Sequence, residues 1–312
     1  MKKRILVIGS LNVDAVIEMK KMPQVGETIL GSKVTYIPGG KGANQVCTVA
    51  RLGDNGKILG CIGQDHFGKM QENSLLHSGV DISTIKKSDS AATGMASIYV
   101  DEEGNNSIVV VPGANAECDV NYIGELDKVI QESDYIILQM EIPIASITYA
   151  IERAKELNKI VILNPAPAPD HISGELLEKI DYITPNETEL MRLCGKRGNA
   201  VEDYRNCAKE LLQKGVKNVL VTLGNQGALL VNAGMEKIFP ARKVLAVDTT
   251  AAGDCFNGAF VVALSEGKDV EEAIIFANAA SSIAVTRNGA QTSIPTRQET
   301  DEIFEQMMSV KK

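Results

Sequence analysis

An alternation of short apolar runs with amphipathic stretches of helical length is the feature that most constrains how this chain can fold. Strand-length apolar runs occur at residues 5–9, 57–62, 134–139, 160–164, 181–184 and 218–223. Stretches with helical character occur at residues 43–52, 66–78, 144–157, 187–194, 201–214, 253–266 and 270–285. Strands that alternate with helices predict a central, mostly parallel sheet flanked by helices, a three-layer α/β fold. Because no linker interrupts the alternation, we expect one domain over residues 1–312.

Two segments depart from this alternation and have the character of antiparallel β-structure. One covers residues 27–40, and the other covers residues 93–115, whose two β-rich runs flank the turn-forming sequence DEEGNN. A small sheet at the strand ends of an α/β fold can cover a ligand, so one interpretation is a β lid built from about 11–40 and 93–115. The alternative is that both segments are extra edge strands.

Composition excludes several classes of partner. The chain carries 40 acidic against 32 basic side chains, a formal charge of −8, which argues against nucleic acid or an acidic membrane as partner. No apolar stretch approaches the roughly 20 residues of a membrane span, and the N-terminal apolar run is too short for a signal peptide. The six cysteines show no C-x-x-C motif, which favours free thiols over zinc sites or disulfides. We therefore expect a cytoplasmic protein.

The sequence DTTAAGDCFNGAF (248–260) is the motif with the clearest chemistry. Its small residues Ala251, Ala252 and Gly253 open a helix, where unpaired backbone N–H groups and the positive end of the helix dipole can bind an anion. Asp254 lies in the first turn, beside such an anion, where it could accept a proton from a hydroxyl nucleophile. The alternative is a carboxylate that only complements the helix dipole.

A second motif, PGGKGANQ (38–45), predicts a tight turn that approaches a ligand. Gly39, Gly40 and Gly42 allow the backbone to come close, while Lys41 and Asn44 supply hydrogen-bond donors to hydroxyl oxygens. The motif is not a Walker A loop, because Lys41 is followed by Gly. Taken alone it is weak evidence, since glycine-rich turns are common in α/β proteins.

Seven motifs in order carry a resemblance to a known family. They are GSLNVD (9–14), GGKGAN (39–44), NPAPA (164–168), TPNETE (184–189), TLGNQG (222–227), DTTAAGDCFNGA (248–259) and TRNGAQ (286–291). Together they closely resemble the PfkB, or ribokinase-like, carbohydrate kinase family over nearly the whole chain. The resemblance implies a ribokinase-like, Rossmann-type fold and an ATP-dependent sugar kinase with Asp254 as the catalytic base. Cys255 departs from the family pattern, which commonly has Thr there, and we expect it to be a packed small residue.

The resemblance also implies the residues that bind each ligand. The sugar-binding set is Asn12, Asp14, Gly40, Lys41, Gly42, Ala43, Asn44, Glu141 and Asp254. The ATP-binding set is Asn186, Thr222, Leu223, Gly224, Asn225, Gln226, Gly227, Gly253, Asp254 and Asn278. Glu189 is implied to act on Mg²⁺ through water. The set at a monovalent cation, usually K⁺, is Asp248, Thr250, Ala284, Arg287, Gly289 and Ser293.

By themselves these residues leave structural alternatives open. Glu141 could be a solvated acid at a strand end, and the NETE run could simply be a helix start with acidic residues near its N-terminus. The resemblance favours the 5-hydroxyl of D-ribose as phosphoryl acceptor. Deoxyribose, fructose, a sugar phosphate or a nucleoside are alternatives, and a non-catalytic sugar or nucleotide sensor is a further one. The family's lid commonly pairs across a dimer, so a homodimer through the lid is expected.

Overall fold

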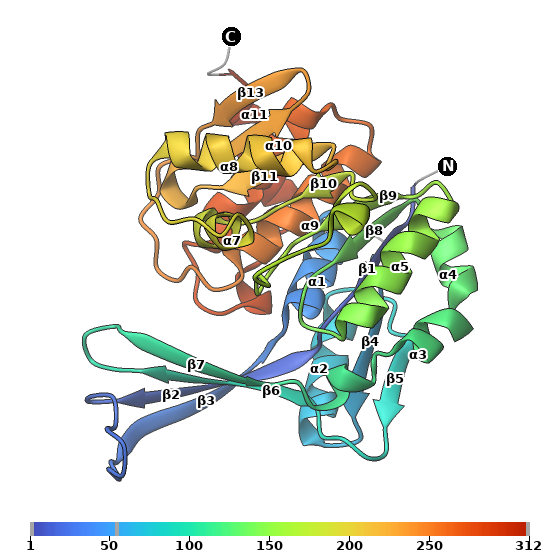
Figure 1. Cartoon of the computed structure of the whole chain (residues 1–312). Helices are drawn as coiled ribbons and strands as arrows, with labels where there is room; N and C mark the ends of the chain where they lie inside the picture. The colour runs from blue at the N-terminus through green and yellow to red at the C-terminus, as the bar shows by residue number, and fades with distance from the viewer. Residues whose placement is uncertain (1–2, 54–55, 310–312) are drawn as a thin grey trace.

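A computed structural model describes residues 3–53 and 56–309 (Figure 1). The strands of its main sheet are β1 (Ile5–Ile8), β4 (Gly56–Gly63), β5 (Ile85–Ser88), β8 (Tyr135–Leu138), β9 (Ile160–Leu163), β10 (Tyr182–Ile183), β11 (Asn218–Thr222), β12 (Ala228–Asn232) and β13 (Met235–Phe239). In this part of the chain the sheet has nine strands in the order β13-β12-β11-β10-β9-β8-β1-β4-β5. From β11 to β5 all neighbours are parallel, whereas β12 and β13 form an antiparallel edge. The predicted mostly parallel sheet is confirmed.

Helices cover both faces of this sheet because its strands are apolar on both sides. In β1, Leu6 and Ile8 belong to one buried cluster, and Ile5 and Val7 belong to the cluster on the opposite face. The first cluster is covered by α3 (Val120–Glu125), α4 (Asp127–Glu132), α5 (Ile144–Glu156), α6 (Gly174–Leu177), α7 (Glu187–Leu193) and α8 (Val201–Gln213). The second is covered by α1 (Lys41–Gly53), α2 (His66–His77), α9 (Ala252–Ser265), α10 (Val270–Ala284) and α11 (Arg297–Ser309). None of the helices in the described residues has the length and apolar character needed to cross a bilayer.

A second, smaller sheet projects from the α/β body (Figure 1). Its strands are β2 (Asn12–Met19), β3 (Gly31–Gly39), β6 (Gly94–Val100) and β7 (Asn106–Val111), in the order β3-β2-β6-β7. The β2–β3 and β6–β7 hairpins are antiparallel, as expected, and the two hairpins are joined by a parallel pairing of β2 with β6. These segments are therefore a separate sheet and not edge strands of the main one, as the lid interpretation predicts.

The structure contains elements that the sequence pattern did not predict. The unpredicted strands are β5, β12 and β13, and the unpredicted helices are α3, α4, α6 and α11. Strands β12 and β13 follow β11 so closely that three apolar runs form one antiparallel meander, which the search for alternating strands and helices passes over. The unpredicted helices α3, α4 and α6 have four to six residues each, too short for a clear amphipathic period.

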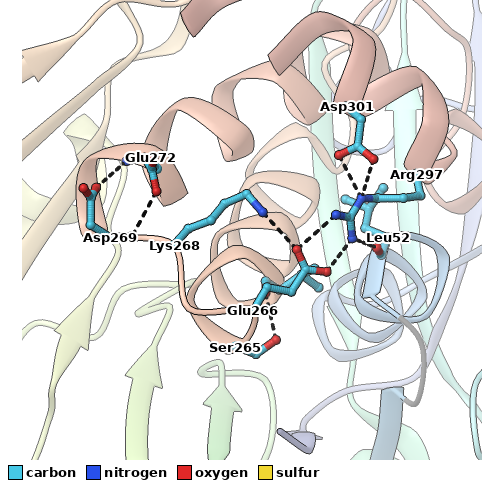
Figure 2. Close-up of polar contacts among 9 residues, drawn as sticks. Leu52, Ser265, Glu266, Lys268, Asp269, Glu272, Arg297 and Asp301 are labelled. Atoms are coloured by element: carbon cyan, nitrogen blue, oxygen red, sulfur yellow. Dashed lines mark hydrogen bonds and ion pairs between the residues drawn. The ribbon is translucent and has the colours of Figure 1, made fainter. Parts of the chain in front are cut away.

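An ion cluster attaches α11 to α1, α9 and α10 (Figure 2). Arg297, the first residue of α11, donates hydrogen bonds to Glu266 after α9 and to Asp301 one turn further along α11. Only the Glu266 contact uses two guanidinium nitrogens, because a single Nε–H is shared between both oxygens of Asp301. Arg297 also donates to the carbonyl oxygen of Leu52 in the last turn of α1 at 2.9 Å. Its guanidinium lies 5.4 Å from the ring centre of Phe276 in α10. One side chain therefore joins α1, α9, α10 and α11.

Candidate active site

The candidate site lies where the parallel strands end and two helices begin. Parallel α/β sheets place ligands at the carboxyl ends of their strands. Here Ser10 follows β1, Glu141 follows β8 and Asn164 follows β9. The helices α1 and α9, which begin at the two glycine-rich motifs, pack against each other beside these strand ends. The fold therefore brings together the motifs near residues 10, 40, 141, 164 and 254.

Asp254 is buried and held in place by two amide side chains. Its Oδ2 accepts a hydrogen bond from Asn44 Nδ2 at 2.9 Å, and its Oδ1 accepts one from Gln45 Nε2 at 2.9 Å. Burial raises the pKa of Asp254, whereas the Lys41 ammonium and these two donors act to lower it. A carboxylate that only complemented a helix dipole would be solvated, so this environment favours the catalytic interpretation.

A network of polar side chains to which the sequence analysis gave no role extends from Asp254. Gln45 also contacts Asn164 at 3.2 Å and accepts from Gln139 at 2.7 Å, and both glutamines are fully buried. On the far side of Asn164, Thr184 bonds Asn257, whose amide donates to the carbonyl oxygen of Gly253. Gln139, Asn164 and Thr184 directly follow apolar strands, which was the available sequence signal for them, whereas the other members lie inside helices. The network fixes the first turn of α9 through side chains rather than through the backbone alone.

The residues expected to form a sugar cradle lie close together at the base of the lid. Gly40 has φ 89°, and a side chain there would place Cβ 2.6 Å from the backbone nitrogen of Asn12. Gly42 is equally confined, because its Cβ would lie 2.6 Å from the carbonyl carbon of Gly9. These two glycines therefore allow the turn before α1 to lie directly against the strand that carries Asn12 and Asp14.

The cradle concentrates negative charge around one cation. Burial, reinforced by Glu141 and Asp254, raises the pKa of Asp14 to about 7 although Lys41 acts to lower it. Burial acts to lower the pKa of Lys41, but the nearby carboxylates outweigh it and the pKa is raised. The carboxylates acting on Lys41 are Asp254, Glu141, Glu189 and Asp14. Lys41 is therefore charged and electrostatically links the sugar end of the site to the α7 end.

Glu141 is part of the site and not a solvated acid. Its Oε2 accepts from the hydroxyl of Ser10 at 2.5 Å and from the backbone N–H of Lys41 at 3.2 Å. It also lines a cavity of about 420 Å³ between the lid and the body, together with Asn12 and Val110. The remaining lining residues are Pro112, Asn115, Ala116, Met140, Ile142, Pro143 and Pro167. A polar end with carboxylate and amide groups and an apolar wall suit a small polyol.

The first turn of α9 offers backbone donors, as predicted, with one difference. Ala251 precedes the helix with φ 58°, and the amides of Ala251, Gly253 and Asp254 have no acceptor within the described part of the chain. The expectation of an unpaired amide is wrong at Ala252, whose N–H donates to the carbonyl oxygen of Thr249 at 3.2 Å. Gly253 is exposed, and a Cβ placed on it meets no atom within 4 Å. The open side of this turn can therefore admit an anion.

Cys255 follows Asp254 and is fully buried. Burial, reinforced by the Asp254 carboxylate, raises the pKa of its thiol to about 12. A thiol in this state is a poor nucleophile at neutral pH. The expectation of a packed small residue agrees with this environment.

The NETE segment forms a reciprocal cap at the start of α7. Asn186 Oδ1 accepts the Glu189 amide at 2.8 Å, and Glu189 Oε2 accepts the Asn186 amide at 2.9 Å. Burial raises the pKa of Glu189, while the cap and Lys41 act to lower it. Among the described residues, no group of three or more His, Cys, Asp or Glu side chains is arranged to hold a metal ion. A single carboxylate of this kind suits Mg²⁺ that keeps most of its waters and phosphate ligands.

The predicted nucleotide turn is the connection between β11 and β12. Residues Gly224–Gln226 form a 3-10 turn, with φ 51° at Gly224 and 102° at Gly227. A side chain at Gly227 would place Cβ 2.0 Å from the carbonyl oxygen of Phe239, so this hairpin requires glycine. The buried side chain of Asn278 donates to that same oxygen at 3.2 Å, which places Asn278 against the backbone beside the turn. The remaining members, Thr222, Leu223, Asn225 and Gln226, lie in or next to the turn.

Asp248 joins the two segments expected at the monovalent cation. It accepts the amide of Thr250 and the amide of Gly289, each at 2.9 Å, so the loop before α9 is attached to the loop after α10. Burial acts to raise the pKa of Asp248, but these bonds outweigh it and the pKa is lowered. Arg287 pairs with Glu299 at 2.6 Å. Ser293 is buried in the loop after α10, and Ala284 is buried at the end of α10.

Comparison with known proteins adds to this geometry. The model of the pfkB family carbohydrate kinases matches residues 2–297. A ribokinase of Haemophilus influenzae is 42% identical over 98% of this chain and 99% of its own length. The structure of a Thermotoga maritima ribokinase has a TM-score of 0.88 and 44% identity, covering 97% of this chain and 99% of that one. The structure of an Arabidopsis thaliana ribokinase complexed with ribose and ATP has a TM-score of 0.90 and 33% identity, covering 98% of this chain and 99% of that one.

Proposed function

We propose that this chain, which belongs to the pfkB family of carbohydrate kinases, transfers the γ-phosphoryl group of ATP to the 5-hydroxyl of D-ribose, giving ribose 5-phosphate and ADP. The observation that carries the proposal is Asp254 itself. It is a buried carboxylate held by two amides, and it lies in the helix turn that presents the free amides of Gly253 and Asp254. A base and an anion site in one turn are what phosphoryl transfer to a hydroxyl requires.

In this proposal the sugar lies between the lid and α1. Asn12, Asp14 and Glu141 accept or donate hydrogen bonds to its hydroxyl groups, and Asp254 accepts the proton of the hydroxyl that attacks. The new bond joins that oxygen to the γ-phosphorus while the bond from the γ-phosphorus to the β–γ bridging oxygen breaks, and ADP leaves. The free amides of the α9 turn hold the phosphoryl oxygens, each donor contributing about 3 kcal/mol to the transition state.

Two metal ions belong to the proposal. Mg²⁺ would neutralise phosphate charge when bound, and Glu189 would hold it through water. A monovalent cation, K⁺, would lie at the loops joined by Asp248. Both carboxylate oxygens of Asp248 already accept hydrogen bonds from backbone amides. The ligands of K⁺ would therefore be mainly backbone carbonyl oxygens.

The lid suggests a homodimer. Val34 and Tyr36 of β3, together with residues 108–111 of β7, are exposed apolar side chains on this sheet. Exposed apolar surface of this kind typically marks a contact site, and a second copy of the lid is the occupant that the family resemblance favours. Sedimentation of the wild-type chain and of Ile108→Asp would test this, with a shift to monomer expected for the variant. A wild-type monomer would contradict the proposal.

The function is tested by measuring ADP release from the full chain with a panel of acceptors. The panel is ribose, deoxyribose, fructose, fructose 6-phosphate and adenosine, each with and without K⁺, and Asp254→Asn serves as the control for contaminating kinases. Ribose is expected to give the highest kcat/KM. Preference for another acceptor would replace ribose and leave the kinase assignment in place. Sugar binding without any ADP release would instead support a non-catalytic sensor.

A further inference from the structure

A buried glutamine connects α2 with the base of the lid. Gln71 is fully buried, and its Nε2 donates to the backbone carbonyl oxygens of Asn12 and Gly39, the latter at 2.6 Å. Asn12 and Gly39 are register partners at the end of the β2–β3 hairpin nearest the body. Gln71 therefore fixes the point at which both strands leave the α/β body.

The other end of the same amide reaches the loop after α10. Gln71 Oε1 accepts from Gln291 Nε2 at 3.4 Å, and Gln291 Oε1 accepts from the Ser74 hydroxyl at 2.5 Å. Gln291 is buried and is the last residue of the TRNGAQ motif, and the proposed function gives Gln291 itself no role. A continuous path of hydrogen bonds therefore runs from Gln291 through Gln71 to the lid base.

The loop that carries Gln291 is in turn attached to the transfer site. Gly289, two residues before Gln291, donates its amide to Asp248, and Asp248 also accepts the amide of Thr250 just ahead of α9. The path therefore begins at the turn proposed to hold the phosphoryl group and ends at the strand that carries Asn12 and Asp14. Neither glutamine lines the cavity beside Glu141.

Two side-chain amides are well suited to this position. An amide supplies both donors and an acceptor, so Gln71 can bond two carbonyl oxygens and a third group at once. Each of these partners is buried, and a buried polar group that loses its partner is destabilising. The loop 285–293 and the hairpin base therefore cannot shift independently without breaking a buried bond.

We propose that Gln71 and Gln291 form a positioning relay through which the loop 285–293 and the lid base adopt their binding arrangement together. The inference rests on the proposed function, because it assigns the sugar to the site at the lid base. Gln71 acts through Asn12 and Gly39 and does not touch the reacting atoms. Sugar affinity should therefore depend on the relay more than the transfer step does.

The first test is a kinetic comparison that uses the best acceptor of the panel. Gln71→Met preserves the side-chain volume and removes the amide. We expect KM for the sugar to rise about tenfold, with KM for ATP and kcat changed less than about threefold, because the variant misplaces sugar contacts only. Tyr122→Phe is the matched control, since it removes a buried hydroxyl that bonds the backbone of β4, away from the relay. It should lower Tm without changing the sugar KM.

Gln291→Met provides a second approach that leaves the bonds from Gln71 to the lid base in place. The two substitutions should be non-additive, so the double variant should raise the sugar KM no more than Gln71→Met does.

Hydrogen exchange gives a readout independent of catalysis. Saturating sugar should slow exchange over residues 285–293 in the wild type, and this effect should disappear in either variant.

These experiments distinguish a failure of the proposed function from a failure of the proposed relay. ADP release by the unmodified chain decides the proposed function, while the variants decide the relay with whichever acceptor the chain uses. Unchanged sugar KM in both folded variants, or sugar-dependent protection of residues 285–293 that survives both, would overturn the relay. Additive effects of the two substitutions would overturn it as well.

Discussion

Gln45 donates from Nε2 to Oδ1 of Asp254 at 2.9 Å, across 209 residues of sequence. This bond favours the ionised carboxylate, so it partly offsets the burial that raises the pKa of Asp254. A base must be ionised to accept a proton. The two amide donors therefore act to keep this buried carboxylate ionised, as the proposed base must be.

The first prediction removes this donor. Gln45→Met should raise the pKa of Asp254, so the acidic limb of the kcat profile should move to higher pH by roughly 0.5–1 unit. The measurement is kcat between pH 5 and 9. Gln139→Met is the matched control, because Gln139 bonds Gln45 but not the carboxylate, and its shift should be smaller. An equal shift in both variants would contradict the direct role of the bond.

The second prediction concerns the anion site at the start of α9. Gly253→Val should reduce kcat by at least about tenfold, because the side chain would project into the space proposed for the phosphoryl group. A Cβ at Gly253 meets no protein atom, so Tm should change little. Gly174→Val is the matched control, since Gly174 also opens a helix and its Cβ also meets open space. Wild-type turnover in Gly253→Val would remove the anion site from this turn.

The third prediction follows from the raised pKa of Asp14. Its pKa is about 7 in the folded chain against 3.8 for the free group, mainly because of burial. The folded state therefore disfavours the ionised form, and the stability contributed by Asp14 falls as pH rises from near 4 to near 7. Asp14→Asn should raise Tm more at pH 8 than at pH 5. An equal Tm gain at both pH values for Asp14→Asn would contradict the raised pKa.

The fourth prediction tests the ion cluster of α11. Arg297→Met should lower the free energy of unfolding by about 1–2 kcal/mol, because Glu266 and the Leu52 carbonyl lose a shared donor. Arg192→Met removes an exposed pair with Asp170 and should cost less than about 0.5 kcal/mol. Urea unfolding measures both. Equal effects would show that the cluster adds nothing beyond an ordinary surface pair.

Local patterns predicted the motifs and the main strands but not the contacts between distant segments. Asp254 could be proposed as a base from the sequence because the small residues just before it indicate the start of a helix. The carboxylates around Lys41 come from residues as far apart as 14 and 254, and no local pattern indicates that they converge. The same holds for Gln139, a polar residue at the end of an apolar strand. Its hydrogen bond to Gln45 forms only because α1 packs over that strand end. The hairpin of β12 and β13 was missed because its apolar runs lack an intervening helix.

Asp254→Asn is the most direct test of the central claim that Asp254 is the base of a sugar kinase. Turnover by ADP release and sugar affinity by titration calorimetry should be measured on the same preparation. Asn preserves the shape of the side chain but cannot accept the proton, so kcat should fall at least about a hundredfold while the sugar Kd changes only a few-fold. Near-wild-type kcat in a variant that still binds the sugar would contradict the claim.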